Sequence, residues 1–198
     1  MREHTRPAPL ILASGSPRRR ELLAKMGYSF ETCSPDVDEH VGGHPRDIVL
    51  TLARRKAEAA AADIPEGIVI ASDTLVSLDG APLGKPADAA DARRMLRALS
   101  GREHEVFSGV CVLDARTGWQ RAVAVRTGVT FRPLSDAEID AYIATGEPMD
   151  KAGAYGIQGG AGRFVAALDG SFENVMGFPV DEVEALLRQA AEEVRPIQ

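Results

Sequence analysis

Residues 10–23 read LILASGSPRRRELL, and this stretch predicts a buried strand, a tight polar loop and then a helix. The apolar run at 10–13 is typical of a short strand in a core. The SGS sequence at 14–16 interrupts the run, and Pro17 suits the first position of a helix, where a missing N–H costs nothing. The order strand, loop, helix indicates an α/β protein.

The same alternation continues along the rest of the chain. Strands are expected at 10–13, 28–33, 68–78, 104–114, 122–131 and 163–168, and helices at 18–26, 45–62, 88–99, 135–145 and 180–193. The Thr117-Gly118 pair joins two of these strands into a hairpin, and 152–162 is a glycine-rich loop. We therefore expect a mixed sheet flanked by helices, in two lobes with a central cleft. A single domain should span residues 1–198, with 1–9 as a flexible extension.

The composition excludes several classes of function. The chain has 198 residues and a net charge of −6, which argues against a nucleic-acid partner. No apolar run reaches the ~20 residues of a membrane span, and residues 1–9 lack the apolar centre of a secretion signal. Cys33 and Cys111 are expected to be free thiols, as in a reducing compartment. We expect a cytoplasmic protein that binds neither a membrane nor stable nucleic acid.

The loop at 14–18 has the features of an anion-binding site. The first N–H groups of a helix lack internal partners, and the helix dipole is positive there. The hydroxyls of Ser14 and Ser16 could approach a phosphate closely, and Arg18 could neutralise it. Three arginines at the start of a helix are unfavourable beside the positive end of the dipole, and a bound polyanion would offset this cost. The two arginines after Arg18 are expected to be solvated. The alternative is a capped helix on which all three are solvated.

Two polar residues interrupt apolar patterns. Lys56 lies near the centre of the apolar stripe of its helix, which consists of Ile48, Val49, Leu52, Ala53, Ala59 and Ala60. A lysine there either reaches back to solvent or meets an anion. Asp73 interrupts the strand at 68–78, where aspartate is disfavoured. Either the strand ends with the carboxylate in solvent, or the carboxylate serves as a general base or a metal ligand.

Three weaker signals complete the candidate site. Lys85 follows a turn, although a solvated lysine is common in such a loop. Gln158 in the glycine-rich loop offers a donor and an acceptor to a nucleobase edge, with a plain flexible loop as the alternative. Glu39 lies in the acidic loop 36–39, whose carboxylates would suit Mg²⁺ or Mn²⁺. An exposed acidic loop is the plainer interpretation.

Six motifs together resemble the Maf family of nucleotide pyrophosphatases. They are LILASGSPRRRELL (10–23), ARRKAEA (53–59), ASDT (71–74), LGKP (83–86), DKAGAYGIQG (150–159) and ENVMGFP (173–179). Each motif alone is weak evidence, but six in this order at compatible spacing are specific. The resemblance covers about residues 10–187.

The resemblance implies a fold similar to that of the inosine-triphosphate pyrophosphatases, usually as a homodimer. It implies cleavage of a nucleoside triphosphate between the α- and β-phosphates with a divalent cation. It matches Asp73 to the family's proton acceptor, and Glu39 to an acidic site residue that would share the metal with it. Positions linked to substrate choice are Arg18, Thr74 and Gln158. Positions that face the phosphates are Ser14, Ser16, Lys56 and Lys85.

The loop DKAGAYGIQG resembles the branch of the family that acts on dTTP and UTP, including modified pyrimidines. The expected function is therefore hydrolysis of these nucleotides to a monophosphate and pyrophosphate. Two alternatives remain open: a 7-methyl-GTP-type pyrophosphatase, and a non-catalytic nucleotide-sensing protein that regulates septum formation. The choice between base and metal ligand for Asp73 also remains open.

Overall fold

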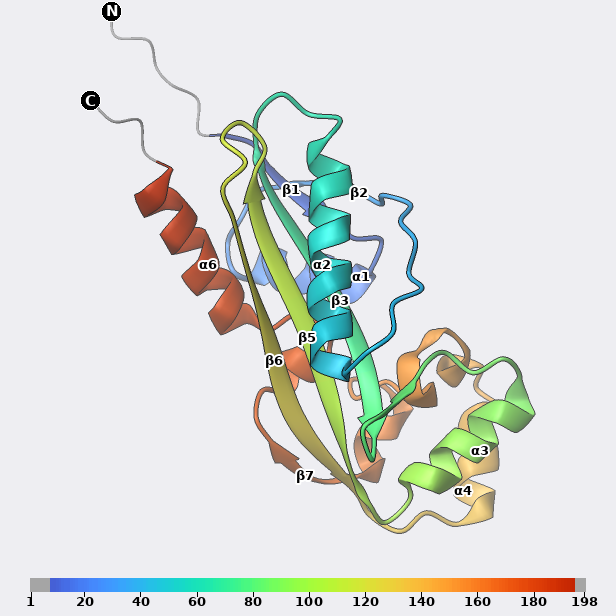
Figure 1. Ribbon diagram of the computed structural model, residues 1–198. Coiled ribbons are helices and arrows are strands. Elements are labelled where there is room, and N and C mark those ends of the chain that lie inside the picture. The colour runs from blue at the N-terminus through green and yellow to red at the C-terminus, as the bar shows by residue number, and fades with distance from the viewer. Residues whose placement is uncertain (1–7, 195–198) are drawn as a thin grey trace, which may run out of the picture.

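A seven-stranded mixed sheet forms the centre of the structure (Figure 1), a computed structural model that describes residues 8–194. The strand order is β2-β1-β3-β5-β6-β7, and β4 pairs with β3 beside β1. The strands are β1 (Leu10–Ala13), β2 (Glu31–Cys33), β3 (Ile68–Leu78), β4 (Ala81–Leu83), β5 (Glu103–Asp114), β6 (Gln120–Phe131) and β7 (Val165–Asp169). β1 runs parallel to β2 and β3, and the other pairs are antiparallel. The predicted mixed sheet is confirmed.

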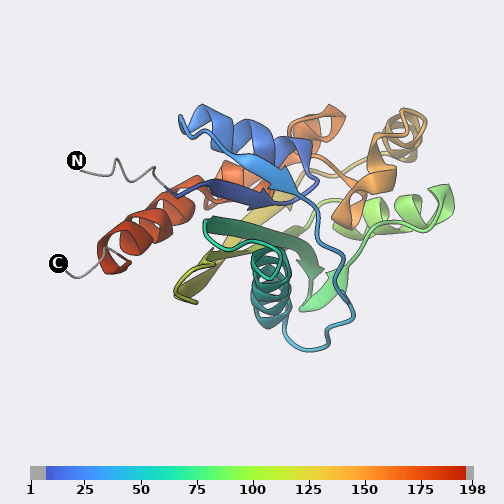
Figure 2. The ribbon, with the colours of Figure 1, turned by 90° about the horizontal axis from the view of Figure 1, so that it is seen from above.

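Helices cover both faces of this sheet (Figure 2). They are α1 (Pro17–Lys25), α2 (Pro45–Ala61), α3 (Ala89–Leu99), α4 (Asp136–Ile143), α5 (Phe172–Val175) and α6 (Val180–Glu193). α2 lies on one face, whereas α1 and α6 lie on the other, and α3 packs beside α4 beyond the end of β3 (Figure 1). Within residues 8–194, no helix combines the length and apolar character needed to cross a membrane.

Alternating residues of the central strands supply two separate cores. Leu12 and Ile70 point into the larger core, which α1, α3, α4 and α6 also line. Ile11 and Val69 point to the opposite face and pack with the small side chains of α2. Because successive strand residues face opposite sides of a sheet, these neighbouring positions determine which layer covers each face.

Small residues bring α2 unusually close to the sheet. A Cβ added to Gly109 of β5 would lie 2.2 Å from the carbonyl oxygen of Val49. No real side chain fits there, so the helix backbone rests directly on the strand. Gly109 is the cross-strand partner of Asp73, and this contact therefore fixes the distance between α2 and the centre of β3.

The predicted elements differ from the observed ones mainly at the loops. β2 begins at Glu31 rather than at residue 28, and α5 was not predicted. The predicted glycine-rich loop contains short 3₁₀ turns at Ala152–Ala154 and Gly160–Phe164. Residues 1–7 of the predicted N-terminal extension lie outside the part of the chain that the structure describes. Pro9, however, accepts a hydrogen bond from the Ile68 N–H, which ties it to the sheet.

The edge of β3 is uncovered over residues 72–75. β1 ends at Ala13, opposite Ala71, and on the same side the pairing with β4 starts only at Val76, opposite Leu83. The chain leaves β1 through the loop at 14–16, so that α1 begins beside this gap. Ligands of open α/β sheets commonly bind outside the carboxyl ends of parallel strands, and the gap lies at that end of β1.

Candidate active site

A cavity of about 1040 Å³ lies over the gap at residues 72–75. Its walls come from the start of α1, the loop before α2, the middle of α2 and the segments at 82–85, 150–152 and 175–177. Regions that are far apart in sequence therefore meet at one opening. All but one of the predicted site residues line this cavity: Ser14, Ser16, Arg18, Glu39, Lys56, Asp73, Thr74 and Lys85.

The loop at 14–16 presents the start of α1 to the cavity. Ser16 is the N-cap, and its hydroxyl accepts from the Arg19 N–H at 3.5 Å. Ser14 is buried, and its hydroxyl accepts from the Ser16 N–H at 3.2 Å. Pro17 occupies the first helical turn, as predicted. Arg18 lines the cavity, so this wall combines a helix N-terminus with two hydroxyls and a cation.

Lys56 meets anions rather than reaching back to solvent. Its Nζ lies 2.7 Å from Asp73 Oδ1 and 2.8 Å from Glu39 Oε1, and its side chain is 15% exposed. The helix buries Ala57 where the wheel placed Ala59, which is partly exposed. The buried face of α2 is therefore rotated slightly from the predicted apolar stripe. Lys56 lies at the border of this face and lines the cavity.

Asp73 lies inside a continuous strand. β3 extends to Leu78, and its ladder with β5 passes through Asp73 without a bulge. The Asp73 side chain is 14% exposed, which excludes the alternative of a strand that ends with its carboxylate in solvent. A carboxylate on a rigid strand, held by a neighbouring ammonium group, suits positioning of a reacting group.

Glu39 lies in the loop before α2, and its carboxylate contacts Lys56. Its side chain is 64% exposed, and the hydrogen bond from Lys56 lowers its pKa, with smaller electrostatic contributions from Lys85 and Arg19. The carboxylate is therefore held in its ionised form. Glu39 and Asp73 therefore share one cationic partner, Lys56.

Arg19 corrects the expectation that the two arginines after Arg18 are solvated. Its Nη1 donates to Ser14 Oγ at 3.2 Å, its Nη2 to Thr74 Oγ1 at 3.0 Å and its Nε to the Gly177 carbonyl at 2.8 Å. Burial lowers its pKa, and the charge of Asp73 opposes that shift. The sequence does not indicate which of three consecutive arginines points into the protein. Arg20 is exposed, as expected.

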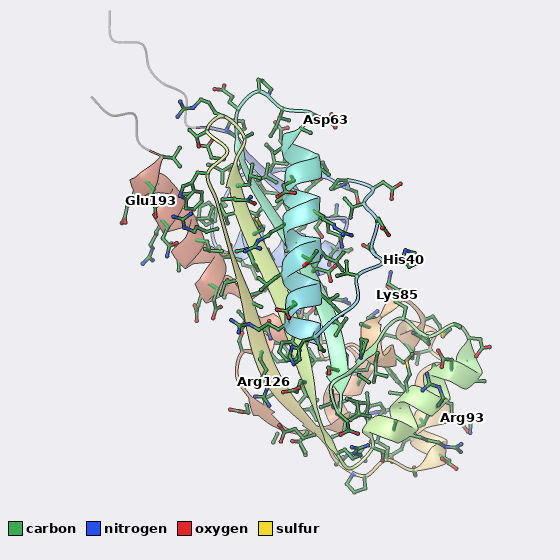
Figure 3. The ribbon with its side chains drawn as sticks, viewed as in Figure 1. His40, Asp63, Lys85, Arg93, Arg126 and Glu193 are labelled. Atoms are coloured by element: carbon green, nitrogen blue, oxygen red, sulfur yellow. The ribbon has the colours of Figure 1, made fainter. Side chains whose placement is uncertain are left out.

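Lys85 and Gln158 occupy different places around the opening. Lys85 is exposed and lines the cavity from the loop after β4, near the loop that carries His40 (Figure 3). Gln158 is also exposed, but it is not among the residues that line the cavity. Its role in substrate choice stays a prediction.

The cavity concentrates positive charge in an acidic protein. Five cations line it, whereas the chain as a whole carries a net charge of −6. The cations are Arg18, Arg19, Lys56, Lys85 and Lys151, and the carboxylates are Glu39, Asp73 and Asp150. Sequence reasoning did not single out Lys151, whose Nζ donates to the Glu147 carbonyl and to Asp150. A site with this excess of cations suits a polyanionic ligand.

The segment ENVMGFP (173–179) contributes to one wall of the cavity. Gly177 has a φ of +101°, and a Cβ there would lie 3.0 Å from Thr74 Oγ1. Its carbonyl oxygen accepts from both Arg19 Nε and Ser72 Oγ. A glycine is needed at this position for both its backbone conformation and its close approach, and Arg19 and Thr74 depend on it for their placement.

Comparison with known sequences identifies the family. Residues 9–190 match the sequence model of the family described as "Maf-like protein". The chain belongs to the Maf family. The match covers every residue that lines the cavity, from Ala13 to Gly177.

Several relatives of this Maf chain share about half of its sequence. A protein of Anaeromyxobacter dehalogenans (strain 2CP-C) is 54% identical over 185 residues, covering 91% of this chain and 93% of the relative. Proteins of Bdellovibrio bacteriovorus and Moorella thermoacetica are 49% and 50% identical, each covering 90% of this chain and 96% and 93% of the relative. All three are named dTTP/UTP pyrophosphatase.

Proposed function

We propose that this chain hydrolyses dTTP and UTP to the nucleoside monophosphate and pyrophosphate. The observation that carries the proposal is a cation-rich cavity with Asp73 held by Lys56 at its floor. A triphosphate supplies the negative charge that such a cavity lacks. The names and the identity of the Maf-family relatives support the choice of substrate.

The start of α1 and the lysines bind the phosphates in this proposal. One end of the triphosphate binds at the N-terminus of α1, where it contacts Ser14, Ser16 and Arg18. The free N–H groups and the helix dipole favour an anion there. Lys85 approaches from the opposite wall. Positive groups fixed around the bond that breaks stabilise the charge that grows on the pyrophosphate leaving group.

Asp73 acts on the water in this proposal. The carboxylate takes a proton from a water that attacks phosphorus, or it holds a cation that binds this water. Lys56 keeps the carboxylate in place through the 2.7 Å contact. A positioned carboxylate that accepts a proton accelerates such reactions by about 10²–10⁴-fold.

The residues present fit a divalent cation that arrives with the nucleotide. Among residues 8–194, no three histidine, cysteine or acidic side chains cluster as a metal site. Mg²⁺, however, is commonly held by one or two carboxylates together with substrate phosphates, and Glu39 and Asp73 supply two carboxylates that both contact Lys56. Mg²⁺ or Mn²⁺ bound to one or both of these carboxylates would neutralise phosphate charge as a Lewis acid.

We also propose a homodimer that works in the cytoplasm. The family resemblance supports the dimer, and the nucleotide substrates support the compartment. Sedimentation of the purified chain would measure the oligomeric state, and a monomer at micromolar concentration would contradict the first of these proposals.

The test is a panel of nucleoside triphosphates incubated with the purified chain and Mg²⁺ or Mn²⁺, with pyrophosphate release as the readout. dTTP and UTP should be turned over faster than the purine triphosphates, including 7-methyl-GTP. Preference for 7-methyl-GTP would assign the chain to the other branch of the family. Tight binding of dTTP without release of pyrophosphate would contradict hydrolysis and favour a nucleotide sensor.

A further inference from the structure

The hydroxyl of Thr74 belongs to a chain of hydrogen bonds that continues behind the cavity. Thr74 Oγ1 lies 2.9 Å from the hydroxyl oxygen of Ser108, its cross-strand neighbour on β5. Ser108 Oγ in turn lies 3.0 Å from the backbone carbonyl oxygen of Asn174. Ser108 and Asn174 are fully buried. On the cavity side, Arg19 Nη2 lies 3.0 Å from Thr74 Oγ1. Within residues 8–194, these are the side-chain partners of the Thr74 hydroxyl.

The two ends of this chain determine where each proton lies. A carbonyl oxygen only accepts, so Ser108 must place its single hydroxyl proton toward Asn174. The proton between the two hydroxyls then belongs to Thr74, which donates it to Ser108. A guanidinium only donates, so Arg19 occupies one lone pair of the Thr74 oxygen. One lone pair of Thr74 remains, and it has no proton to offer the cavity.

We propose that Ser108 is a positioning residue that makes Thr74 a hydrogen-bond acceptor toward the ligand, and that Thr74 thereby selects the N3–H group of uracil and thymine. The inference rests on the proposed function and deepens it. Phosphate oxygens are acceptors and cannot pair with Thr74 in this state. Uracil and thymine carry a donor at ring position 3, whereas cytosine carries an acceptor at the same position.

The buried end of the chain keeps this polarity fixed. The Asn174 side-chain amide donates to the Val106 carbonyl at 3.1 Å and to Thr127 Oγ1 at 2.9 Å. The Asn174 carbonyl also accepts from the Gly177 N–H at 2.9 Å. These contacts hold the carbonyl against Ser108, so reversal of the chain would place two acceptors 3.0 Å apart in a buried position. The segment ENVMGFP thus gains a role in choosing the base.

The experiment compares kcat/KM for dTTP and dCTP in the wild-type chain, Ser108→Ala and Ser77→Ala. Removing the Ser108 hydroxyl frees the Thr74 proton to turn toward the cavity, where it could pair with N3 of cytosine. The preference for dTTP over dCTP should fall by about tenfold, since a polarity mismatch has roughly that effect. Ser77 is the matched control, because it is a buried serine of the neighbouring strand β3 whose hydroxyl has no hydrogen-bond partner among residues 8–194.

Two analogues identify the donor on the ligand. N3-methyl-dTTP lacks the ring N–H and should be a poor substrate for the wild-type chain. The 3′-deoxy analogue of dTTP lacks the sugar hydroxyl and should be turned over nearly as well as dTTP. Loss of activity with the 3′-deoxy analogue, and not with the N3-methyl analogue, would mean that the sugar is the donor and would overturn the assignment.

Thr74→Val keeps the shape of the side chain and removes the acceptor, so it should also lower the preference for dTTP. An unchanged dTTP-to-dCTP ratio in both Ser108→Ala and Thr74→Val would overturn the inference while leaving the proposed function intact. No turnover of dTTP by the wild-type chain would instead contradict the proposed function. The two failures are therefore distinguishable.

Discussion

Lys56 is the residue on which the two acidic groups of the site converge. It contacts Asp73 at 2.7 Å and Glu39 at 2.8 Å from a side chain that is mostly buried. The sequence pointed to it because a lysine interrupts the apolar side of a helix. The identity of its partners was not predictable, because Glu39 and Asp73 reach it from a separate loop and strand.

Replacing Lys56 with Met keeps the length of the side chain and removes its charge. Turnover of dTTP should fall by about 10²-fold, a common effect of losing one preorganised charged donor. The pKa of Glu39 should rise, because the hydrogen bond from Lys56 is the largest cause of its lowered value. Kinetic assays and ¹³C NMR titration of the carboxyl group would measure the two effects.

Arg54→Met is the matched control, since Arg54 is an exposed cation on the same helix. It should leave both quantities near their wild-type values. Equal losses in the two variants would indicate a general effect of charge on α2 and would contradict a specific role for Lys56.

His104 makes stability depend on pH. It is buried against Tyr155, its Nε2 lies 2.8 Å from the tyrosine hydroxyl, and burial lowers its pKa from 6.5 to about 4. Between about pH 4 and pH 6.5, the His104 ring therefore binds a proton in the unfolded chain but not in the folded chain. The free energy of unfolding should fall as pH drops from 6.5 toward 4, by on the order of 3 kcal/mol in total.

Denaturation of wild type and His104→Gln by urea at several pH values would isolate this contribution. The variant should lose less stability over the same pH range, because its amide does not titrate. Parallel profiles for the two proteins would show that other groups cause the loss at low pH.

At the scale of the elements, the contact between α2 and β5 brings Lys56 and Asp73 together. Gly109 permits it, since a Cβ there would meet the Val49 carbonyl at 2.2 Å. Gly109→Ala must push α2 away from the sheet or distort β5. We expect a loss of about 2–3 kcal/mol in the free energy of unfolding, as for other overpacked cores, together with reduced activity.

Gly42→Ala is a suitable comparison, because a Cβ there meets nothing within 4 Å and the residue does not have a positive φ. Its stability in urea should match that of the wild-type chain. A Gly109→Ala variant that was equally stable would show that the helix does not rest on the strand as described.

Across the whole molecule, sequence patterns predicted the elements with clear periodicity and missed those fixed by distant contacts. The run at 68–78 and the hairpin strands were predicted because apolar residues and turn residues are local signals. The short helix α5 and the 3₁₀ turns were not, because they are stabilised by buried groups such as Asn174 and Tyr142, which contact remote strands and loops. Arg19 was missed for the same reason, because its partners Thr74 and Gly177 are far away in sequence.

The site is assembled by the topology of the sheet. β1 and β4 leave residues 72–75 of β3 uncovered, and the chain places five cations from four separate segments around this gap. Sequence motifs could indicate each of several residues alone, but only the fold brings them to one opening. In the proposed reaction, this opening cleaves a nucleoside triphosphate between its α- and β-phosphates, and Asp73 acts on the attacking water.

³¹P NMR of dTTP hydrolysis by the wild-type chain and by Asp73→Asn would measure both the bond that is cleaved and the contribution of Asp73. The wild-type chain should convert the three triphosphate resonances to those of dTMP and pyrophosphate. Asp73→Asn should slow this conversion by at least about 100-fold while the folded structure is retained. Formation of dTDP and inorganic phosphate, or an unchanged rate in Asp73→Asn, would contradict the account.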